Sequence, residues 1–258
     1  MTRKHTLLIT LFSISAVIAL SLPTALHAQD DPPPQTVRPP MYLGISAGIF
    51  YSMHSGGFGY PAECEDCAVY GDASGIGTAF DLRLSVPLTP WLRFEPRLFG
   101  EGRSGDFTSD LIESEIIGKD MKPQQIQLED EFSSSLQLVG IDLLAAFHIG
   151  RSGIAVLAGP AIAFRMSESA TVTERILSPD GVTFLDGSRE QTRFDGDTEI
   201  ARGMHAGIRA GLSYTLPVSR ALALGFEATY LLSLQTVSET DDWKTSGARG
   251  MLSVLYAL

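Results

Sequence analysis

The sequence has few cysteines, few basic residues and, after residue 28, no long apolar run. Cysteine accounts for 2 of the 258 residues, so the chain is not a disulfide-dense scaffold. Lys and Arg number 19 against 30 Asp and Glu, and a net charge of -11 leaves little positive charge to displace the counterions of nucleic-acid phosphates. No stretch after residue 28 reaches the ~20 apolar residues of a membrane-spanning helix. We therefore expect no nucleic-acid partner and no helical span in that part.

Motifs for catalysis and for cofactor binding are missing as well. The sequence contains no Gly-rich phosphate loop and no cluster of metal ligands, and its 5 His are scattered. His148 and His205 have no Ser or Asp at the short spacing expected of a catalytic constellation. We therefore predict a non-enzymatic protein without a metal and without a cofactor.

The first 28 residues are typical of a secretory signal peptide. Arg3 and Lys4 precede an apolar stretch over 7–22, and Leu26-His27-Ala28 forms a small-residue cleavage site. The alternative is a retained membrane anchor. Cleavage removes two basic and no acidic residues, so 17 basic residues face 30 acidic ones and the net charge becomes -13. Residues 29–40 contain five Pro and are expected to form an extended linker before a domain over 41–258.

From residue 41 onward, apolar and polar residues alternate with period two, which predicts β-strands. Eight segments show the pattern, each about as long as the ~9–11 residues of a tilted membrane-spanning strand or slightly longer. They cover 42–52, 76–88, 91–103, 136–149, a stretch from 154, 203–216, a stretch from 221, and a last stretch that ends at 258.

The connections between these segments alternate between tight and long. Tight turns are expected at 89–90, 150–152 and 217–220, and long loops at 53–75, 104–135, 167–202 and 237–247. This rhythm predicts an all-β fold, an eight-stranded antiparallel up-and-down barrel. A soluble, lipocalin-like barrel is the alternative, but an eight-stranded interior has no room for four or five bulky apolar residues per strand. We therefore predict a transmembrane barrel whose bulky residues face lipid.

Aromatic residues lie close to the predicted tight turns and to the end of the chain. In membrane barrels, aromatic side chains gather in girdles at the two lipid–water interfaces. The residues expected to form the girdle at the short-turn end are Trp91, Phe147, Tyr214 and Tyr256.

The strand rhythm, the signal peptide and the last strand, 250–258, resemble the eight-stranded OmpA/OmpX-like outer-membrane barrels. More narrowly, they resemble the PorT-like outer membrane protein beta-barrel domain. The last strand is similar to that family's C-terminal assembly signal, although this chain ends in Leu258 where the family has an aromatic residue. The resemblance implies a monomer in the bacterial outer membrane, among its lipid and lipopolysaccharide, with periplasmic termini and short turns, long extracellular loops and insertion by the barrel-assembly machinery.

The polar face of the predicted strands carries charges of both signs. A buried charge is costly unless it is paired, and Arg suits bidentate pairing with carboxylates. We predict an ion-pair network that plugs the lumen, with a gated pore or proton path as the alternative. Its members are Asp81, Arg83, Arg93, Glu95, Arg97, Asp142, Arg209 and Glu227.

The predicted loops hold most of the remaining acid and both cysteines. Cys64 and Cys67 are predicted to form a disulfide in an oxidising compartment. A zinc half-site with His54 is one alternative, and a redox centre is disfavoured because three neighbouring carboxylates oppose thiolate formation. Ser178-Pro179-Asp180-Gly181 predicts a hairpin turn, so strands are expected to form a rim beyond the membrane. Such a rim can bind an extracellular ligand, or divalent cations that bridge lipopolysaccharide phosphates.

These observations favour a structural or surface-binding, adhesive role through the extracellular loops. A small transport or secretion-accessory barrel is the second hypothesis, and an outer-membrane lipid-modifying enzyme is the third. A continuous water path through the lumen favours the second, and a His/Ser/Asp cluster at the lipid-facing rim favours the third.

Overall fold

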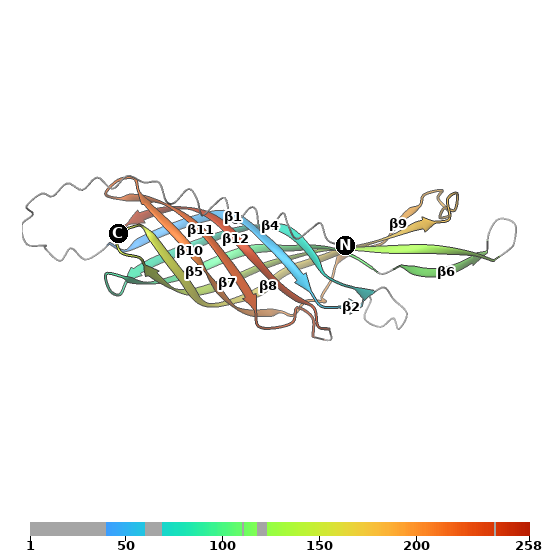
Figure 1. The fold of residues 1–258 in the computed structure, drawn as a ribbon, viewed down its shortest axis with the longest axis horizontal. Helices are drawn as coiled ribbons and strands as arrows, with labels where there is room; N and C mark the ends of the chain where they lie inside the picture. The colour runs from blue at the N-terminus through green and yellow to red at the C-terminus, as the bar shows by residue number, and fades with distance from the viewer. Residues whose placement is uncertain (1–39, 60–68, 110, 118–122, 240) are drawn as a thin grey trace, which may run out of the picture. The chain divides into compact units, whose positions relative to one another are not determined.

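The computed structural model describes residues 40–59, 69–109, 111–117, 123–239 and 241–258, which form an all-β structure (Figure 1). The described residues contain no helix that is long and apolar enough to cross a membrane. The predicted signal peptide, linker residues 29–39 and the predicted Cys64–Cys67 disulfide lie outside the described residues.

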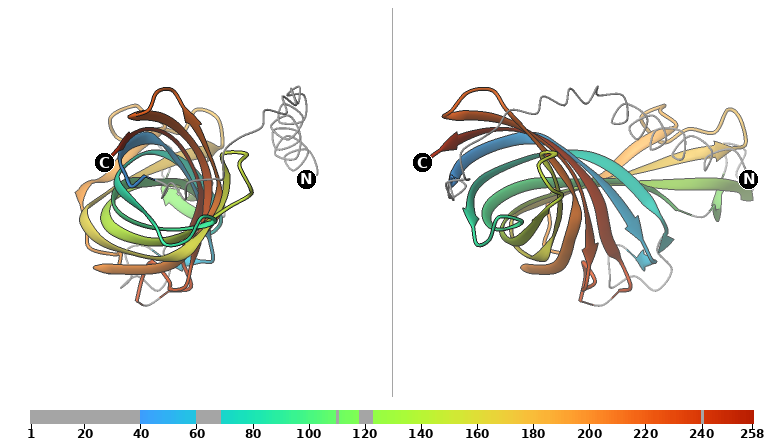
Figure 2. Two further views of the ribbon diagram at one scale, coloured as in Figure 1. Left: turned by 90° about the vertical axis from the view of Figure 1, so that its left-hand side faces the viewer. Right: turned by 60° about the vertical axis from the view of Figure 1, so that its left-hand side comes forward.

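Eight antiparallel strands close into a barrel, as predicted, which is seen along its axis in Figure 2. Each strand pairs with the next barrel strand in the chain, β7 with β8, and β12 closes the ring on β1. The eight strands are β1 (Tyr42–Ser55), β4 (Ala73–Pro87), β5 (Leu92–Thr108), β7 (Pro123–His148), β8 (Ile154–Ser178), β10 (Met204–Pro217), β11 (Leu222–Ser233) and β12 (Lys244–Ala257).

The closing pair joins the two ends of the described chain. Its register runs from Tyr42 opposite Ala257 to Ser55 opposite Lys244, so every residue of β1 has a partner on β12. Closure matters because backbone N–H and C=O groups within lipid have no water to bond, and a closed ring leaves no open edge.

Tight turns connect the strands at one end of the barrel, hereafter the short-turn end. Local side chains hold two of these turns: the Thr89 hydroxyl accepts a hydrogen bond from Leu92 N at 3.0 Å, and the Ser219 hydroxyl accepts one from Leu222 N at 3.1 Å. The third turn uses Gly150 with φ of +58°, a conformation that L side chains rarely adopt. The predicted alternation of tight turns with long connections is confirmed.

The opposite end, hereafter the long-loop end, carries strands beyond the barrel, as the predicted rim requires, and they are longer than the predicted segments. β7 and β8 are 26 and 25 residues long and run on through much of the predicted loops 104–135 and 167–202. Two further strands flank them, β6 (Ile112–Ile117) on β7 and β9 (Glu190–Asp197) on β8. The predicted strands were too short because outward side chains turn polar there, whereas period two itself continues.

The four strands in the order β6-β7-β8-β9 form what we call the projecting sheet, which extends beyond the barrel in Figure 1. The predicted hairpin at Ser178–Gly181 lies at the end of β8, where Gly181 has φ of +88°. A second, two-stranded sheet pairs β2 (Phe58–Gly59) with β3 (Val69–Tyr70).

One close approach in the barrel wall gives a testable prediction. A Cβ atom at Gly48 of β1 would lie 1.9 Å from the carbonyl oxygen of Gly250 on β12, whereas a Cβ at Gly250 would meet nothing within 4 Å. We expect Gly48→Ala to prevent β1 from pairing with β12, and hence most chains to lose the fast-migrating folded band in unboiled detergent gels.

Gly250→Ala is the matched control, because it adds the same methyl group to the facing strand. We expect it to keep the folded band. Equal folding of the two variants would show that the backbones of β1 and β12 are not as close as described.

Candidate functional site in the lumen and at the long-loop end

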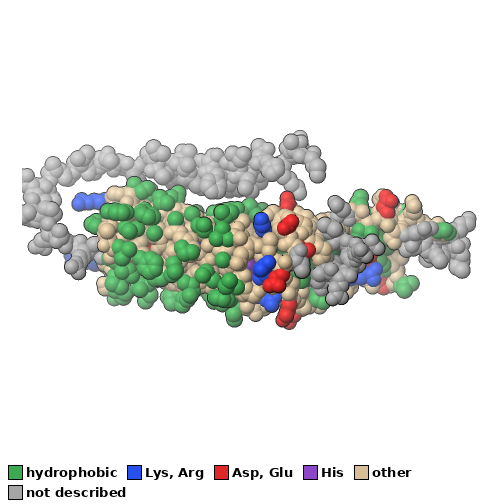
Figure 3. All heavy atoms as spheres, turned by 90° about the horizontal axis from the view of Figure 1, so that it is seen from below, with side chains coloured by type: hydrophobic (Ala, Val, Ile, Leu, Met, Phe, Trp, Pro, Cys, Tyr) green, Lys and Arg blue, Asp and Glu red, His purple; other side chains and the backbone are tan. Residues whose placement is uncertain are grey.

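Bulky apolar side chains cover the outside of the barrel wall. Ile45, Phe80 and Leu252 are 64%, 61% and 62% exposed. Outward residues of this kind occur on every barrel strand and form the continuous hydrophobic band of Figure 3, with charged side chains beyond one edge of the band. A closed sheet with such a band is suited to lipid, where exposed apolar surface is not a cost. This is a transmembrane β-barrel. The soluble barrel, which requires the bulky residues inside, does not fit this chain.

The four predicted girdle residues all face outward near the short-turn end. Trp91 and Tyr256 are 55% and 53% exposed, and Phe147 and Tyr214 are also exposed. The Trp91 ring stacks on Phe147 with 6.1 Å between the ring centroids. Their amphipathic rings would suit a lipid–water boundary, so the girdle stays a prediction with a consistent placement.

All eight charged residues predicted for the lumen are buried in the interior of the barrel, where Glu227 on β11 meets three arginines. Its carboxylate accepts hydrogen bonds from Arg97 at 2.7 and 2.8 Å, from Arg83 at 3.2 Å and from Arg249 at 3.3 Å. One carboxylate therefore stabilises three guanidinium groups that come from three other strands.

A second group of charges centres on Arg209 of β10. Its guanidinium lies 3.0 Å from Glu101 and 3.1 Å from Asp142, and it lies over the ring of Phe99 at 5.0 Å. Arg249 joins this group to the first, because its Nη2 atom is 3.3 Å from both Asp142 and Glu227. The two groups thus form one continuous network across the barrel.

Small hydroxyl residues fill the space between the charged side chains. Ser46 donates to Asp81 at 2.7 Å and accepts from Arg83 at 2.8 Å, and Ser253 also accepts from Arg83. These hydroxyl groups bond to carboxylate oxygens and guanidinium N–H groups. Such additional hydrogen bonds stabilise buried charges.

Arg93 lies closer to the short-turn end than the other lumen charges, and its guanidinium does not contact a carboxylate directly. It donates to the Ser85 hydroxyl at 2.7 Å and to the carbonyl oxygen of Pro40, and it lies over the Tyr42 ring at 5.0 Å. Ser85 in turn donates to Glu95 at 2.9 Å, and Glu95 is 2.7 Å from Arg97. Arg93 therefore reaches the network only through a hydroxyl group.

Three members of the lumen network were missed in the sequence: Glu101, Arg103 and Arg249. They are 2%, 3% and 1% exposed, and Arg103 pairs with Glu101 through two hydrogen bonds. The signal was present, because period two on β5 continues inward from Arg97 to Glu101 and Arg103, and on β12 it continues from Ser253 back to Arg249. With these three, the lumen set of the described residues holds six arginines and five carboxylates, namely Arg83, Arg93, Arg97, Arg103, Arg209 and Arg249 with Asp81, Glu95, Glu101, Asp142 and Glu227.

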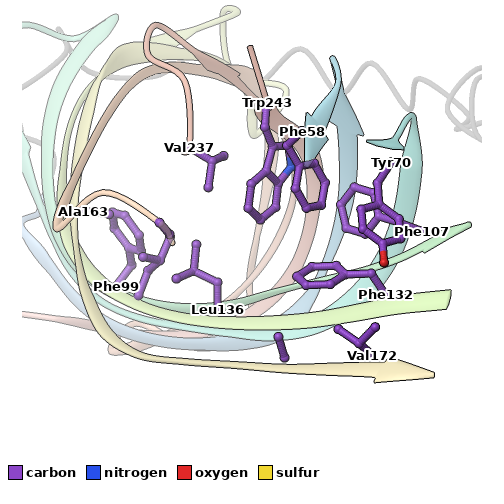
Figure 4. Packing of buried hydrophobic residues seen from close by; sticks show 13 residues of the cluster. Phe58, Tyr70, Phe99, Phe107, Phe132, Leu136, Ala163, Val172, Val237 and Trp243 are labelled. Carbon is purple, nitrogen blue, oxygen red and sulfur yellow. The ribbon is translucent and has the colours of Figure 1, made fainter. Parts of the chain in front are cut away.

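Aromatic side chains pack together in the interior at the long-loop end (Figure 4). Phe58 stacks on Trp243 with 4.6 Å between ring centroids and 17° between planes, and Phe107 packs edge-on against both rings. Tyr70 and Phe132 complete the group, which we call the aromatic cap. Its five members are at most 2% exposed and come from β2, β3, β5, β7 and the loop between β11 and β12.

His54, near the end of β1, lies against the aromatic cap. The Trp243 indole N–H donates to His54 Nδ1 at 3.0 Å, and the His54 Nε2 atom is 2.8 Å from the carbonyl oxygen of Ser104. The Thr245 hydroxyl is also 3.0 Å from Nδ1. A hydroxyl beside an imidazole is a geometry used by nucleophilic enzymes. Here the Thr245 side chain is buried beside the cap, so no substrate reaches it in this conformation.

The projecting sheet has one apolar and one charged face. Ile126, Leu128 and Ile176 are buried on the first, where Val182 and Phe184 pack against them. On the other face, Arg175 lies 3.9 Å from Glu129, 3.6 Å from Glu131 and 3.4 Å from Glu190. Among the described residues, three carboxylates surround Arg175 here, which gives this part of the face a negative potential.

Carboxylates also meet near the apolar face of the projecting sheet. Burial and the neighbouring Glu174 raise the pKa of Asp130 above its usual range, while Arg193 opposes the shift. Arg193 pairs with Glu174 and lies over the Phe184 ring at 5.7 Å. Burial and Glu174 therefore destabilise the ionised form of Asp130, and the positive charge of Arg193 partly offsets this effect.

A groove of about 560 Å³ opens at the long-loop end. Its walls are residues 198–203 before β10 and residues 238, 239 and 241 before β12, with Arg165 and Gly59 at its sides. Arg202 is held there by hydrogen bonds to the Ser238 carbonyl oxygen at 3.1 Å and the Thr236 hydroxyl at 3.3 Å. The groove is therefore a recess among the described residues of the long-loop end.

No protein-family profile and no curated protein sequence matches the chain. Among solved structures, it is similar to Neisserial surface protein A, with 10% identity, a TM-score of 0.32, and coverage of 84% of this chain and 97% of that one. It is also similar to Ail, the attachment invasion locus protein of Yersinia pestis, with 9% identity, a TM-score of 0.27 and coverage of 84% and 98%. A third is the outer membrane protease OmpT from Escherichia coli, with 8% identity, a TM-score of 0.32 and coverage of 84% and 95%. Likenesses at this level say nothing about what this chain binds or does.

Proposed function

We propose that this chain is a non-enzymatic, non-conducting barrel of the bacterial outer membrane that displays the projecting sheet for surface binding. The observation that carries the proposal is the combination of a filled lumen with an elaborated long-loop end. The barrel wall then anchors the protein in the membrane, and the residues exposed beyond the membrane bind the partner.

The filled lumen supports an anchor rather than a channel. Arg97, Arg209 and Arg249 are at most 1% exposed, and each lies within 3.3 Å of a carboxylate from another strand. Above this network the aromatic cap closes the long-loop end. A solute would have to break several buried ion pairs and separate packed rings to cross the barrel, which is costly in a low-dielectric interior.

The type of barrel supports a bacterial outer membrane. An all-β barrel with an apolar outer band, together with the signal peptide that the sequence predicts, fits that membrane. The short turns and the termini would face the periplasm and the projecting sheet the exterior, among lipopolysaccharide. We propose a monomer, inserted by the barrel-assembly machinery.

The projecting sheet supports the surface-binding role. β7 and β8 carry it beyond the apolar band, and a cluster of buried apolar residues packs on one of its faces. Loops that rise from a rigid scaffold are where binding residues concentrate in proteins. The acidic face around Glu129, Glu131 and Glu190 fits a partner with a basic surface.

The test has an electrical and a binding arm. Refolded full-length protein in a planar lipid bilayer should give no steady conductance, and a large steady conductance would support the transport hypothesis instead. In the second arm, cells that display the chain are compared with cells that display a variant whose β6–β7 and β8–β9 hairpins are cut back to short turns. The probes are three immobilised proteins with basic surfaces, namely ribonuclease A, cytochrome c and a core histone.

Loss of adhesion to at least one of these proteins in the shortened variant is the expected result. Equal adhesion of both cell types to all three would overturn the surface-binding role. Unboiled gel migration confirms that the shortened barrel is folded.

A further inference from the structure

A small cavity in the interior of the barrel, near the long-loop end, combines apolar walls with polar side chains. Its volume of about 10 Å³ is room for one water molecule. Phe99 and Ala163 contribute to the apolar walls, and Arg103, His205 and Ser233 contribute polar groups. Cavities with apolar linings stay dry, whereas polar partners of this kind hold a buried water in place.

His205, near the start of β10, brings an unpartnered nitrogen atom to this cavity. The residue is 4% exposed, and its Nε2 atom has no hydrogen-bond partner among the described residues. The ring also bonds to the backbone of Arg202, whose N–H group already donates to Val237. The imidazole therefore donates from Nδ1 to the Arg202 carbonyl oxygen, and the neutral ring keeps a lone pair on Nε2. A buried acceptor without a donor is costly, so Nε2 requires a donor from the cavity.

Arg103, on β5, contributes N–H groups to the same cavity. Its Nε and Nη2 atoms both donate to Glu101 Oε1, at 3.0 and 2.6 Å, so the N–H groups of Nη1 can serve another acceptor. They do not bond to His205 directly, because Nε2 of that ring has no partner among the described residues. A molecule between the two side chains must therefore donate to His205 and accept from Arg103. Water does both.

A small anion suits this cavity less well than water does. The charge of Arg103 would attract an anion, but the lone pair on His205 Nε2 would face its negative charge. A protonated ring would remove that conflict, yet a second positive charge beside a guanidinium is disfavoured. Water also suits Ser233, whose hydroxyl group donates to the Gln235 carbonyl oxygen at 2.8 Å and keeps lone pairs for a further donor.

We propose that this cavity is a binding site for one ordered water molecule, which bridges His205 on β10 to Arg103 on β5. The water donates to His205 Nε2 and to Ser233 Oγ and accepts from Arg103 Nη1, which gives the about 3 hydrogen bonds of a typical buried water. Arg103 shares Glu101 with Arg209, so the water joins His205 to the ion-pair network. The network thereby extends from the middle of the lumen to the start of β10.

Oxygen-17 relaxation dispersion of the full-length barrel in detergent micelles counts the long-lived water molecules inside it. His205→Leu removes the acceptor and fills part of the cavity with apolar atoms, so we expect this variant to lose one long-lived water relative to the parent. His205→Gln is the matched control, because its side-chain carbonyl oxygen can accept from the same water, and it should keep the parent's count. Unboiled gel migration confirms that both variants are folded.

A second measurement uses the parent protein alone. Nitrogen-15 NMR of the His205 ring at neutral pH should show the proton on Nδ1 and a hydrogen-bonded lone pair on Nε2. The proposal is overturned if Nε2 carries the proton, or if the parent and His205→Leu hold the same number of long-lived waters. A chloride-35 signal that the parent broadens and His205→Leu does not would also overturn it, because the cavity would then bind an anion.

Discussion

Glu227→Ala should lower the free energy of unfolding by about 3–5 kcal/mol, because it leaves buried guanidinium groups without their shared carboxylate. Arg97, Arg83 and Arg249 all lie within 3.3 Å of Glu227, and none of the three is more than 4% exposed. Urea unfolding of the barrel in phospholipid vesicles, followed by tryptophan fluorescence, measures the change. We expect this to be among the largest effects of any single substitution in the barrel.

Glu190→Ala is the matched control on the projecting sheet. The Glu190 carboxylate is 55% exposed and lies 3.4 Å from Arg175, so the same truncation there should cost at most about 1 kcal/mol. The double variant Arg97→Met with Glu227→Met should lose less than the sum of the two single variants, since apolar replacement of a whole buried pair is better tolerated than removal of one partner. Equal losses for Glu227→Ala and Glu190→Ala would show that the lumen charges are solvated.

Leu252→Arg should also destabilise the barrel strongly. Leu252 is 62% exposed in the middle of the apolar band, between Ala47 on β1 and Phe226 on β11. An arginine near the midplane of a lipid bilayer costs about 2–4 kcal/mol in a membrane barrel. The barrel refolded in vesicles should lose this amount of unfolding free energy.

Gln191→Arg tests the same side chain beyond the band, because Gln191 is an exposed residue of β9 in the projecting sheet. Its effect should stay within about 0.5 kcal/mol, as for surface substitutions in water. If Leu252→Arg were as mild as Gln191→Arg, the apolar band would not lie in lipid.

The two predictions separate the two surfaces that make this chain both hydrophobic and acidic. The band carries the apolar residues, and the lumen of the described residues holds a nearly balanced set of charges. On the charged face of the projecting sheet, three carboxylates meet one arginine among the described residues. This acidic surface is the part of the chain to which our proposal assigns surface binding.

Several features of the barrel were predictable from the sequence because they depend on local rules. Period two fixes which side chains share a face of a strand. The sequence therefore predicts that Arg83, Asp142 and Arg209 face the lumen and that Ile45 and Leu252 face outward, as the structure has them. Tight turns near residues 89 and 150 follow from Pro and Gly, which restrict the backbone locally. Strand number, antiparallel order and the facing of the wall follow from these two rules together.

Period two does not set the height of a residue along the barrel axis. That height depends on the stagger between strands, which closure of the whole ring decides. Arg97 and Glu227 are 130 residues apart in sequence and meet only because of this stagger. Arg93, two residues before Glu95, bonds to Ser85 and Pro40 and not to a carboxylate. The sequence therefore indicated which charges are inside and left their partners open.

The sequence indicated strands beyond the membrane, but the contacts that join separate loops at the long-loop end come from the tertiary structure. His54 and Trp243 are 189 residues apart, and no spacing rule connects them. The length of β7 and β8 was decided in the same way, by pairing with β6 and β9 outside the lipid. Local backbone preference determined the barrel wall and its facing, whereas the lumen pairs, the aromatic cap and the projecting sheet arise from contacts between distant segments that only closure brings together.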